Sequence, residues 1–499
     1  MINVGKLREK KDWRLPMIGG AIKSTISRAI LCCVYLTFAA DSAHADVVIE
    51  NVNIVDVENG EITEHQTVLI EGNRITRIAE RFEPPVTAER IDGEGKFLIP
   101  GLWDSHVHIF SSPNEPDTAL PLYLMHGITG VRDMGALWPI EDQQALQAKI
   151  ETGTVLGPRL ILSGAWVDAR PGSWPGMFLA DTPAEARKVV AQIEEEGWAA
   201  VKSYSMLDEA TYLALAEASE GAGLRIVGHI PERVGLETAI AAGQDGMEHF
   251  GRIPMACSTA EDRMIGELRA AMEREAAREE VFAIMASRNR IILESWDEQL
   301  CLRVLAQVAS AGLHVSPTLV VADFYLGNWP SADAPRMQLI PPQVREAWGR
   351  PDFRLQAMTD EVRGLAQESI ALDRKTFLLA HRAGVPILAS SDASFANPYL
   401  FHGFSLLDEL DLYVEIGLTP REALYTATVA PPRFFELGDQ DGTVAIGRRA
   451  DLVLLDANPL EGLETLREPH AVIVNGRLLD SEALAAMGAD LREKARSDE

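Results

Sequence analysis

The segment that decides the fold is Phe97-Leu98-Ile99-Pro100-Gly101-Leu102-Trp103-Asp104-Ser105-His106-Val107-His108, in which an apolar run leads into a His-x-His pair. Residues two apart on a strand face the same side, so the imidazoles of His106 and His108 can converge on one metal ion. The pair alone is weak evidence, because isolated histidines on a surface or in a core give the same pattern. The segment therefore predicts a metal site only if further ligands follow other strands.

Polar residues follow other apolar strand candidates in the same way. They are Lys202 after Ala200-Val201, His229 after Ile226-Val227-Gly228, His249 at the end of Gly246-Met247-Glu248-His249, and Asp392 after Ile387-Leu388-Ala389-Ser390-Ser391. Barrels of parallel strands build their active sites at the carboxyl ends of the strands. Four histidines, a lysine and an aspartate at such positions are hard to explain by packing, and we expect them to meet in one site.

Between residues 100 and 435 short apolar runs alternate with helical patterns. The strand candidates include residues 130–131, 160–162, 200–201, 225–227, 315–321 and 385–389. Two helices are predicted to begin after Thr182 and Thr419, where Pro follows and Glu three residues later forms a capping box. Residues 258–290 are rich in Glu and Arg and predict a solvated helix, with a lid or a partner surface as the alternative. This alternation predicts an α/β fold with a parallel sheet, open or closed into a barrel.

Both flanks of this region read as short strands. Residues 47–80 contain four apolar runs separated by turn signals, and residues 450–455 and 471–474 are strands, the second followed by Asn475-Gly476, a hairpin signal. We expect one small β domain made of residues 46–99 and 439–490, bracketing a central domain at 100–438, with a tail at 491–499.

The amino terminus has the features of a signal peptide, predicted at residues 1–45. Lys23 and Arg28 precede an apolar run at 29–40, and Ala43-His44-Ala45 forms a small-x-small cleavage site before Asp46. The run is too short to span a bilayer, which needs about 20 apolar residues. A buried amino-terminal helix is the alternative. The pattern predicts a periplasmic or secreted protein without stable membrane insertion after cleavage, whether translation starts at Met1 or at Met17.

Composition excludes several classes of protein. The 499 residues carry 46 Lys and Arg against 74 Asp and Glu, a net charge of −28, which argues against a nucleic-acid or anionic-membrane surface. A hydrophobic content of 47% with 24% charged residues excludes a disordered chain. Four cysteines are too few for a disulfide scaffold. After cleavage only Cys257 and Cys301 remain, and either a pair or two free, packed thiols fit the sequence.

Taken together, these motifs resemble the amidohydrolase superfamily, in its imidazolonepropionase-like, metal-dependent branch, which includes dipeptidase-like enzymes. The resemblance rests on residues 96–108, 127–135, 201–204, 227–231, 248–249, 391–392, 403–406, 417–424 and 447–453. Two departures weaken any transfer of dipeptide specificity, though not of the metal chemistry. The loop from Trp166 to Pro175 lacks a Gly-Gly-His motif, and Leu407 stands where such relatives often have histidine.

The resemblance implies a distorted (β/α)8 TIM-type barrel with a small composite β-sandwich domain built from both termini. It also implies two divalent metal ions, expected to be Zn²⁺. His106, His108 and Asp392 would hold one ion, and His229 and His249 the other. Lys202 would bridge them as a carbamate. Electrostatics agree, because two divalent ions repel an ammonium group and attract an anionic carbamate.

The same resemblance implies an exported hydrolase that cleaves C–N bonds of a small-molecule amide or short peptide. A hydroxide bridging the two ions would attack the carbonyl, and Asp392 would act as general base and then as general acid. Tyr204 lies two residues beyond Lys202, so it would face the same cavity and hold a substrate carboxylate or an oxyanion. An ordinary half-buried tyrosine fits equally well. Arg132 and His402 are weaker polar candidates.

Three alternatives compete with this hypothesis. A mononuclear deaminase would not need Lys202. A lactonase, esterase or phosphotriesterase would use the same nucleophile on another electrophile. A non-catalytic binding protein on the hydrolase scaffold is disfavoured because all six predicted ligands remain. The sequence does not identify the substrate and leaves the oligomeric state open, a homo-oligomer included.

Overall fold

The computed structural model describes residues 45–135, 137–352, 355 and 359–497. The predicted signal peptide, apart from Ala45, lies outside these residues. Among the helices within them, none is long and apolar enough to cross a membrane.

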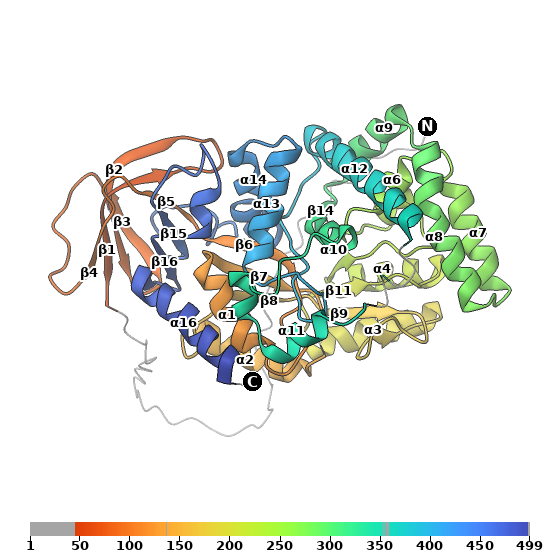
Figure 1. The fold of residues 1–499 in the computed structure, drawn as a ribbon, viewed down its shortest axis with the longest axis horizontal. Helices are drawn as coiled ribbons and strands as arrows, with labels where there is room; N and C mark the ends of the chain where they lie inside the picture. Colours follow the sequence, from red (N-terminus) through yellow and green to blue (C-terminus); the bar gives the residue numbers. More distant parts are fainter. Residues whose placement is uncertain (1–44, 136, 353–354, 356–358, 498–499) are drawn as a thin grey trace, which may run out of the picture.

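Strands from both ends of the chain pair in one eight-stranded sheet, seen at the left of Figure 1. Its order is β17-β16-β15-β5-β1-β2-β3, with β4 beside β1. The bounds are β1 (Val47–Val55), β2 (Ile62–Glu71), β3 (Arg74–Ala79), β4 (Glu89–Asp92), β5 (Phe97–Pro100), β15 (Leu452–Leu455), β16 (Ala471–Val474) and β17 (Arg477–Asp480).

The sheet curls, so that the start of β3 returns to the segment before β15. Ile75 donates its backbone N–H to Arg448, and Ala450 donates to Asn73. Side chains alternate between two cores, because neighbouring strand residues face opposite sides. Leu452 belongs to a small core enclosed by the sheet, whereas Val453 belongs to the main core. The composite domain therefore packs directly on the central domain.

The central domain is a closed barrel of parallel strands. The bounds are β6 (Leu102–Val107), β7 (Ile128–Asp133), β8 (Arg159–Leu162), β9 (Ala165–Asp168), β11 (Ala200–Ser203), β12 (Arg225–Gly228), β13 (Gly246–Glu248) and β14 (His314–Ser316), with a short β10 (Phe178–Leu179) beside β9. Parallel pairing joins β6-β7-β8, β10-β9-β11-β12 and β13-β14. β8 pairs with β7, whereas β9, which begins three residues after β8 ends, pairs with β11, so β8 and β9 share the third of eight barrel positions.

Backbone hydrogen bonds close the ring between these groups. Ala199 donates to Leu162, and Asp245 donates to Ile226. The eighth position is an extended segment with isolated bridges, in which Leu388 donates to Val315 and Asp392 donates to His106, returning to the first strand. This closure confirms the predicted (β/α)8 TIM-type barrel with a composite β domain.

Helices surround the barrel and complete the fold (Figure 1). Their bounds are α1 (Glu115–Met125), α2 (Ile140–Glu151), α3 (Pro183–Glu196), α4 (Glu209–Ala222), α5 (Leu236–Ala241), α6 (Arg252–Ala256), α7 (Glu261–Glu273), α8 (Arg278–Ser295), α9 (Glu298–Ala311), α10 (Ala322–Leu326), α11 (Pro342–Trp348), α12 (Asp360–Arg382), α13 (Phe404–Ile416), α14 (Pro420–Thr428), α15 (Ala430–Phe434) and α16 (Ser481–Ser497). Short 3₁₀ helices are η1 (Leu319–Val321), η2 (Pro335–Leu339) and η4 (Glu464–Arg467).

Three local expectations need correction or refinement. The strand predicted at 315–321 ends at Ser316, because the Glu409 carboxylate accepts the N–H groups of Leu319 and Val320 and stabilises a helical turn there. The single helix predicted at 258–290 is two helices, α7 and α8. The tail predicted at 491–499 does not begin at a break, since α16 continues through it and Leu491 is buried.

Two helix starts and one cysteine pair can be compared with the sequence predictions. Thr419 and Glu422 form a full capping box. Thr182 caps its helix as expected, but the Glu185 carboxylate accepts from Asp181 and Arg170 instead of completing the box. A disulfide joins Cys257, at the end of α6, to Cys301 in α9, which settles the pairing that the sequence left open.

Candidate metal centre

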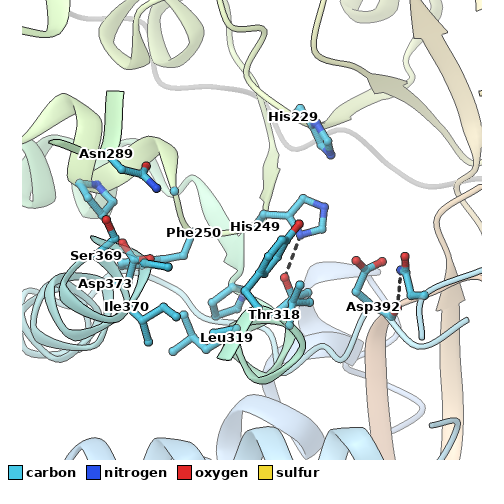
Figure 2. Close-up of a pocket in the computed structure, with 18 of the residues that line it drawn as sticks. His229, His249, Phe250, Asn289, Thr318, Leu319, Ser369, Ile370, Asp373 and Asp392 are labelled. Atoms are coloured by element: carbon cyan, nitrogen blue, oxygen red, sulfur yellow. Dashed lines mark hydrogen bonds between the residues drawn. The ribbon is translucent and has the colours of Figure 1, made fainter. Parts of the chain in front are cut away.

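Four imidazoles gather at the carboxyl ends of the barrel strands. His106 lies in β6, while His229 and His249 directly follow β12 and β13. Ring centroids are 5.2 Å apart for His106 and His108, 5.0 Å for His106 and His249, and 4.9 Å for His229 and His249. Figure 2 shows His229, His249 and Asp392 on the same side of the cavity. The fold therefore brings together histidines from strands one, five and six.

Three residues offer converging donor atoms. Asp392 Oδ1 lies 3.4 Å from His106 Nε2 and 3.2 Å from His108 Nε2, and the two Nε2 atoms are 3.3 Å apart. One ligand atom from each of these residues lies within 4.8 Å of the others, a spacing that one metal ion can bridge. Imidazole nitrogen and carboxylate oxygen are ligands that suit zinc. The geometry therefore fits one predicted ion site.

Each histidine uses its Nδ1 atom within the protein. The four partners lie within hydrogen-bond distance: Glu248 Oε2 at 2.7 Å for His106, the Gly135 carbonyl at 2.9 Å for His108, Ser205 Oγ at 2.8 Å for His229 and Thr318 Oγ1 at 2.8 Å for His249. Such contacts fix the ring orientation and leave Nε2 for a metal. His229 Nε2 is buried without a partner among the described residues, which is costly unless a ligand occupies it. The second predicted ion site therefore also fits the residues present.

Lys202 lies at the same end of the barrel. It is buried, and its Nζ donates to the Met134 carbonyl at 2.7 Å. Burial lowers the pKa of Lys202 to about 8, although the Glu248 and Asp392 carboxylates act in the opposite direction. Carbon dioxide reacts with a neutral amine, so a lowered pKa increases the reactive fraction near neutrality. The environment of Lys202 is therefore compatible with the predicted carbamate.

Burial sets the protonation of the histidines. Desolvation, helped by the Lys202 charge, lowers the pKa values of His106 and His229 well below the usual range. Neutral imidazoles are the form that binds metals. Burial opposes ionisation of Asp392, but its hydrogen bond with His108 and its electrostatic interactions with His249, His108 and Lys202 outweigh that penalty and lower its pKa. Burial therefore favours the metal-binding form of His106 and His229, while the polar neighbours of Asp392 favour its ionised form.

Two candidate ligands sit on left-handed backbone. His249 has φ of 64° and Asp392 has φ of 57°, and Thr318, which contacts His249, has φ of 49°. Non-glycine residues adopt this conformation at an energetic cost, and such strain concentrates at functional sites. Hydrogen bonds from His249 N to Ser316 O and from Asp392 N to His106 O, both 2.8 Å, hold the strained residues in place.

The structure reveals supporting residues that sequence reasoning missed. Glu248 contacts His106 with one oxygen and accepts from Arg132 at 2.7 Å with the other. Asp104 accepts from the backbone N–H and the hydroxyl of Ser391, which ties the first barrel strand to the eighth segment. The sequence offered one signal for Glu248 and Asp104, an acidic residue inside a short apolar strand candidate. It could not reveal their partners, because these come from segments distant in the sequence.

The three other predicted polar residues, Arg132, His402 and Tyr204, differ in whether they line the cavity. Arg132 supports Glu248 and does not line the cavity. His402 is buried between Tyr123 and Glu115, whose side-chain oxygens lie 2.7 and 2.9 Å from its ring nitrogens, and it does not line the cavity either. Tyr204 does line it.

Tyr204 is held against the histidines. Its ring stacks on His229 with centroids 4.2 Å apart, and its hydroxyl accepts from Trp174 Nε1 at 2.9 Å. Burial raises the pKa of Tyr204, so the phenol keeps its proton and can donate it to an acceptor. Tyr204 faces the same cavity as Lys202, as expected from the sequence, whereas its role in catalysis or substrate binding stays a prediction.

A cavity of about 770 Å³ opens beside these residues. His108, Lys202, His229, His249 and Asp392 line one part of it. Its other walls include Phe250, Leu319 and residues of α8 and α12, so the helix predicted to be solvated also faces the cavity. This volume is in the range of small-molecule sites. The arrangement can bind a small molecule with one of its bonds beside the candidate metal ligands.

The amidohydrolase family model matches residues 97–479, most of the chain. The chain belongs to the amidohydrolase family. This amidohydrolase is therefore a hydrolase that acts on C–N bonds, as predicted from the sequence.

Individual relatives are distant. Ochratoxinase from Aspergillus niger is 22% identical over 460 residues, covering 79% of this chain and 78% of that protein. The structure of a bottromycin amidohydrolase matches with a TM-score of 0.69 at 21% identity, covering 90% of each chain. The structure of a Xaa-Pro dipeptidase with bound methionine matches with a TM-score of 0.61 at 19% identity, covering 87% of this chain and 100% of the other. These structural matches support the fold.

Proposed function

We propose that this amidohydrolase hydrolyses an amide or peptide bond of a small molecule or short peptide with two divalent ions, expected to be zinc. The observation that carries the proposal is the set of four histidines whose Nδ1 atoms are all occupied. The Nε2 atoms of His106 and His108 lie 3.4 and 3.2 Å from the Asp392 carboxylate, and His108, His229 and His249 line a cavity of about 770 Å³.

The proposed ligand sets follow the positions of the side chains. His106, His108 and Asp392 would hold one ion, His229 and His249 the other, and a carbamate on Lys202 would join them. When bound, the ions would lower the pKa of a water molecule and withdraw electron density from a carbonyl oxygen.

The protein supplies the proton transfers and the positioning. Asp392 would accept a proton from the attacking water as the oxygen bonds to the carbonyl carbon. The same proton would pass to the amine nitrogen as the C–N bond breaks, leaving a carboxylic acid and an amine. The Tyr204 phenol, positioned by Trp174, would donate a hydrogen bond to the oxyanion or hold a substrate carboxylate.

An amide screen with metal analysis tests this proposal. Purified protein would be assayed against small amides, dipeptides and matched esters, with bound metal measured in the same samples. We expect about two divalent ions per chain and turnover of at least one amide. Activity confined to esters would favour the lactonase or esterase alternative. Full activity without bound metal would end the proposal.

We further propose that the protein is exported. The support is the charged, apolar and small-x-small order of residues 23–45 together with the Cys257–Cys301 disulfide, because disulfides persist in oxidising compartments. Amino-terminal sequencing of the protein from fractionated cells should find Asp46 first, outside the cytosol. An uncleaved chain in the cytosol would contradict export.

A further inference from the structure

The cavity has a second polar end, away from the candidate metal ligands. Figure 2 shows Asn289, Ser369, Ile370 and Asp373 gathered opposite His229, His249 and Asp392. Phe250 and Leu319 lie between the two groups. We call Asn289, Ser369, Ile370 and Asp373 the distal end of the cavity.

Helices build the distal end. Asn289 comes from α8, and the other three residues come from α12, which packs against α8. The cavity-lining positions 362, 366, 369 and 373 recur every three or four residues, so one face of α12 lines the cavity. Asp373 is half-buried on that face. Its carboxylate is therefore presented to whatever occupies the cavity.

The charge of Asp373 is uncompensated by the described part of the chain. No ion pair or hydrogen bond of its carboxylate is found there, and burial raises its pKa to about 7 with no cation acting against the rise. Arg374 also lines the cavity but forms no pair with Asp373, because consecutive helical residues point about 100° apart. A partly desolvated carboxylate without a partner costs free energy, which a bound cation would recover.

We propose that the distal end binds a cationic group of the substrate, a primary ammonium or a guanidinium, with Asp373 as its counter-ion. This inference rests on the proposed function and narrows it to small amides or short peptides that carry a basic group. An ammonium has three donors and no acceptor, and a carboxylate, an amide oxygen and a hydroxyl oxygen can all accept from it. Asp373, Asn289 and Ser369 supply that set.

The apolar side chains between the two ends fit the same substrate class. Phe250 and Leu319, continued by Ile370 at the distal end, would pack along an aliphatic chain that joins the basic group to the scissile bond, as the stem of a lysine side chain does. A neutral substrate of equal length would keep this packing and lose the ion pair. The preference for a basic group would therefore depend on Asp373 and not on the metal ligands.

Matched peptides test the inference through kcat/KM. The set pairs lysine with norleucine, which lacks only the ammonium group, on each side of the scissile amide. The wild type should prefer one lysine peptide over its norleucine partner by roughly tenfold or more. Asp373→Asn should reduce that ratio to near one while leaving the norleucine rate within about twofold. Ser369→Ala should reduce the ratio partly.

Glu368→Gln is the matched control. Glu368 is an exposed acidic residue of α12 outside the cavity, so its variant removes the same charge from the same helix and should keep the lysine preference. Equal rates for lysine and norleucine peptides in the wild type would overturn the inference and leave the proposed function standing. A lysine preference that survives Asp373→Asn would also overturn it.

A binding measurement separates the two proposals if no peptide is hydrolysed, an outcome that counts against the proposed function. Lysine amide and norleucine amide would be titrated calorimetrically into metal-loaded Asp392→Asn protein, with and without Asp373→Asn. Tighter binding of lysine amide that disappears with Asp373→Asn supports the inference. Equal dissociation constants for the two amides overturn it.

Discussion

The two ends of the cavity differ in the elements that build them. The metal-facing end, made of His108, Lys202, His229, His249 and Asp392, takes its side chains from strand ends of the barrel. The distal end takes its side chains from α8 and α12. Strand ends are fixed by the hydrogen bonds that close the barrel, whereas helices can vary without disturbing that ring. The difference suggests that reaction chemistry belongs to the barrel and substrate choice to the helices.

Metal removal should have the largest effect on activity, because the proposed cleavage takes place at the metal-facing end and depends on both ions. Incubation with a chelator is expected to abolish hydrolysis, and added zinc should restore it. Lys202→Ala should reduce the metal content to one ion or fewer per chain, measured by elemental analysis. Full activity of metal-free protein would contradict the dinuclear proposal.

Asp392→Asn should lose most hydrolysis while keeping much of the metal. Asparagine can still offer one oxygen to an ion but cannot accept a proton at working pH. Loss of a general base typically costs about 10²–10⁴-fold in rate. Amides should lose far more than activated esters, whose leaving groups depart as anions. Equal losses on a matched amide and ester, at equal metal occupancy, would show that Asp392 is only a ligand.

Tyr204→Phe should lower kcat by about 10²-fold if the phenol stabilises the oxyanion, because removing one such donor typically costs 10²–10³-fold. A rise in KM with unchanged kcat would instead assign Tyr204 to a substrate carboxylate. Trp174→Phe, which removes the indole N–H donated to Tyr204, should give a smaller loss of the same kind. Unchanged kinetics in both variants would make Tyr204 an ordinary packed tyrosine.

Glu248→Gln should weaken metal binding by about 10–100-fold, the typical cost of losing a partner of a ligating histidine. Glu248 contacts both His106 and Arg132, and none of these three residues lines the cavity. The variant should therefore recover activity when excess zinc is supplied. Activity that stays low at full metal occupancy would assign Glu248 a role beyond positioning His106.

Asp373→Asn should have the smallest effect on a neutral substrate, with a change within about twofold, since it leaves the barrel untouched. Comparing it with Glu248→Gln on the same neutral amide sharpens the contrast between the two ends. If Asp373→Asn also lowered metal content, the distal end would not be separate from the metal centre.

The sequence by itself determined the alternating α/β class and the residues of the metal-facing end, and its family resemblance added the closed barrel. His106, His108, Lys202, His229, His249 and Asp392 could be found because each lies at or just beyond the end of a strand candidate. Barrel enzymes place active-site residues at strand ends. A strand end can be recognised from the neighbouring residues alone, so one sequence is enough to find such positions. The composite β domain was predictable for the same reason, from short strands and turn signals at both termini.

Only the tertiary structure decided which residues support those ligands. Glu248 and Arg132 meet, and Thr318 reaches His249, because particular strands are neighbours around a closed barrel. The helical turn after Ser316 likewise depends on the Glu409 carboxylate, which lies about 90 residues away in sequence. Nothing in the local sequence marks Asp373, which lines the cavity only because α12 packs beside it. Local sequence specifies elements and their ends, whereas contacts between distant segments arise only when the chain packs.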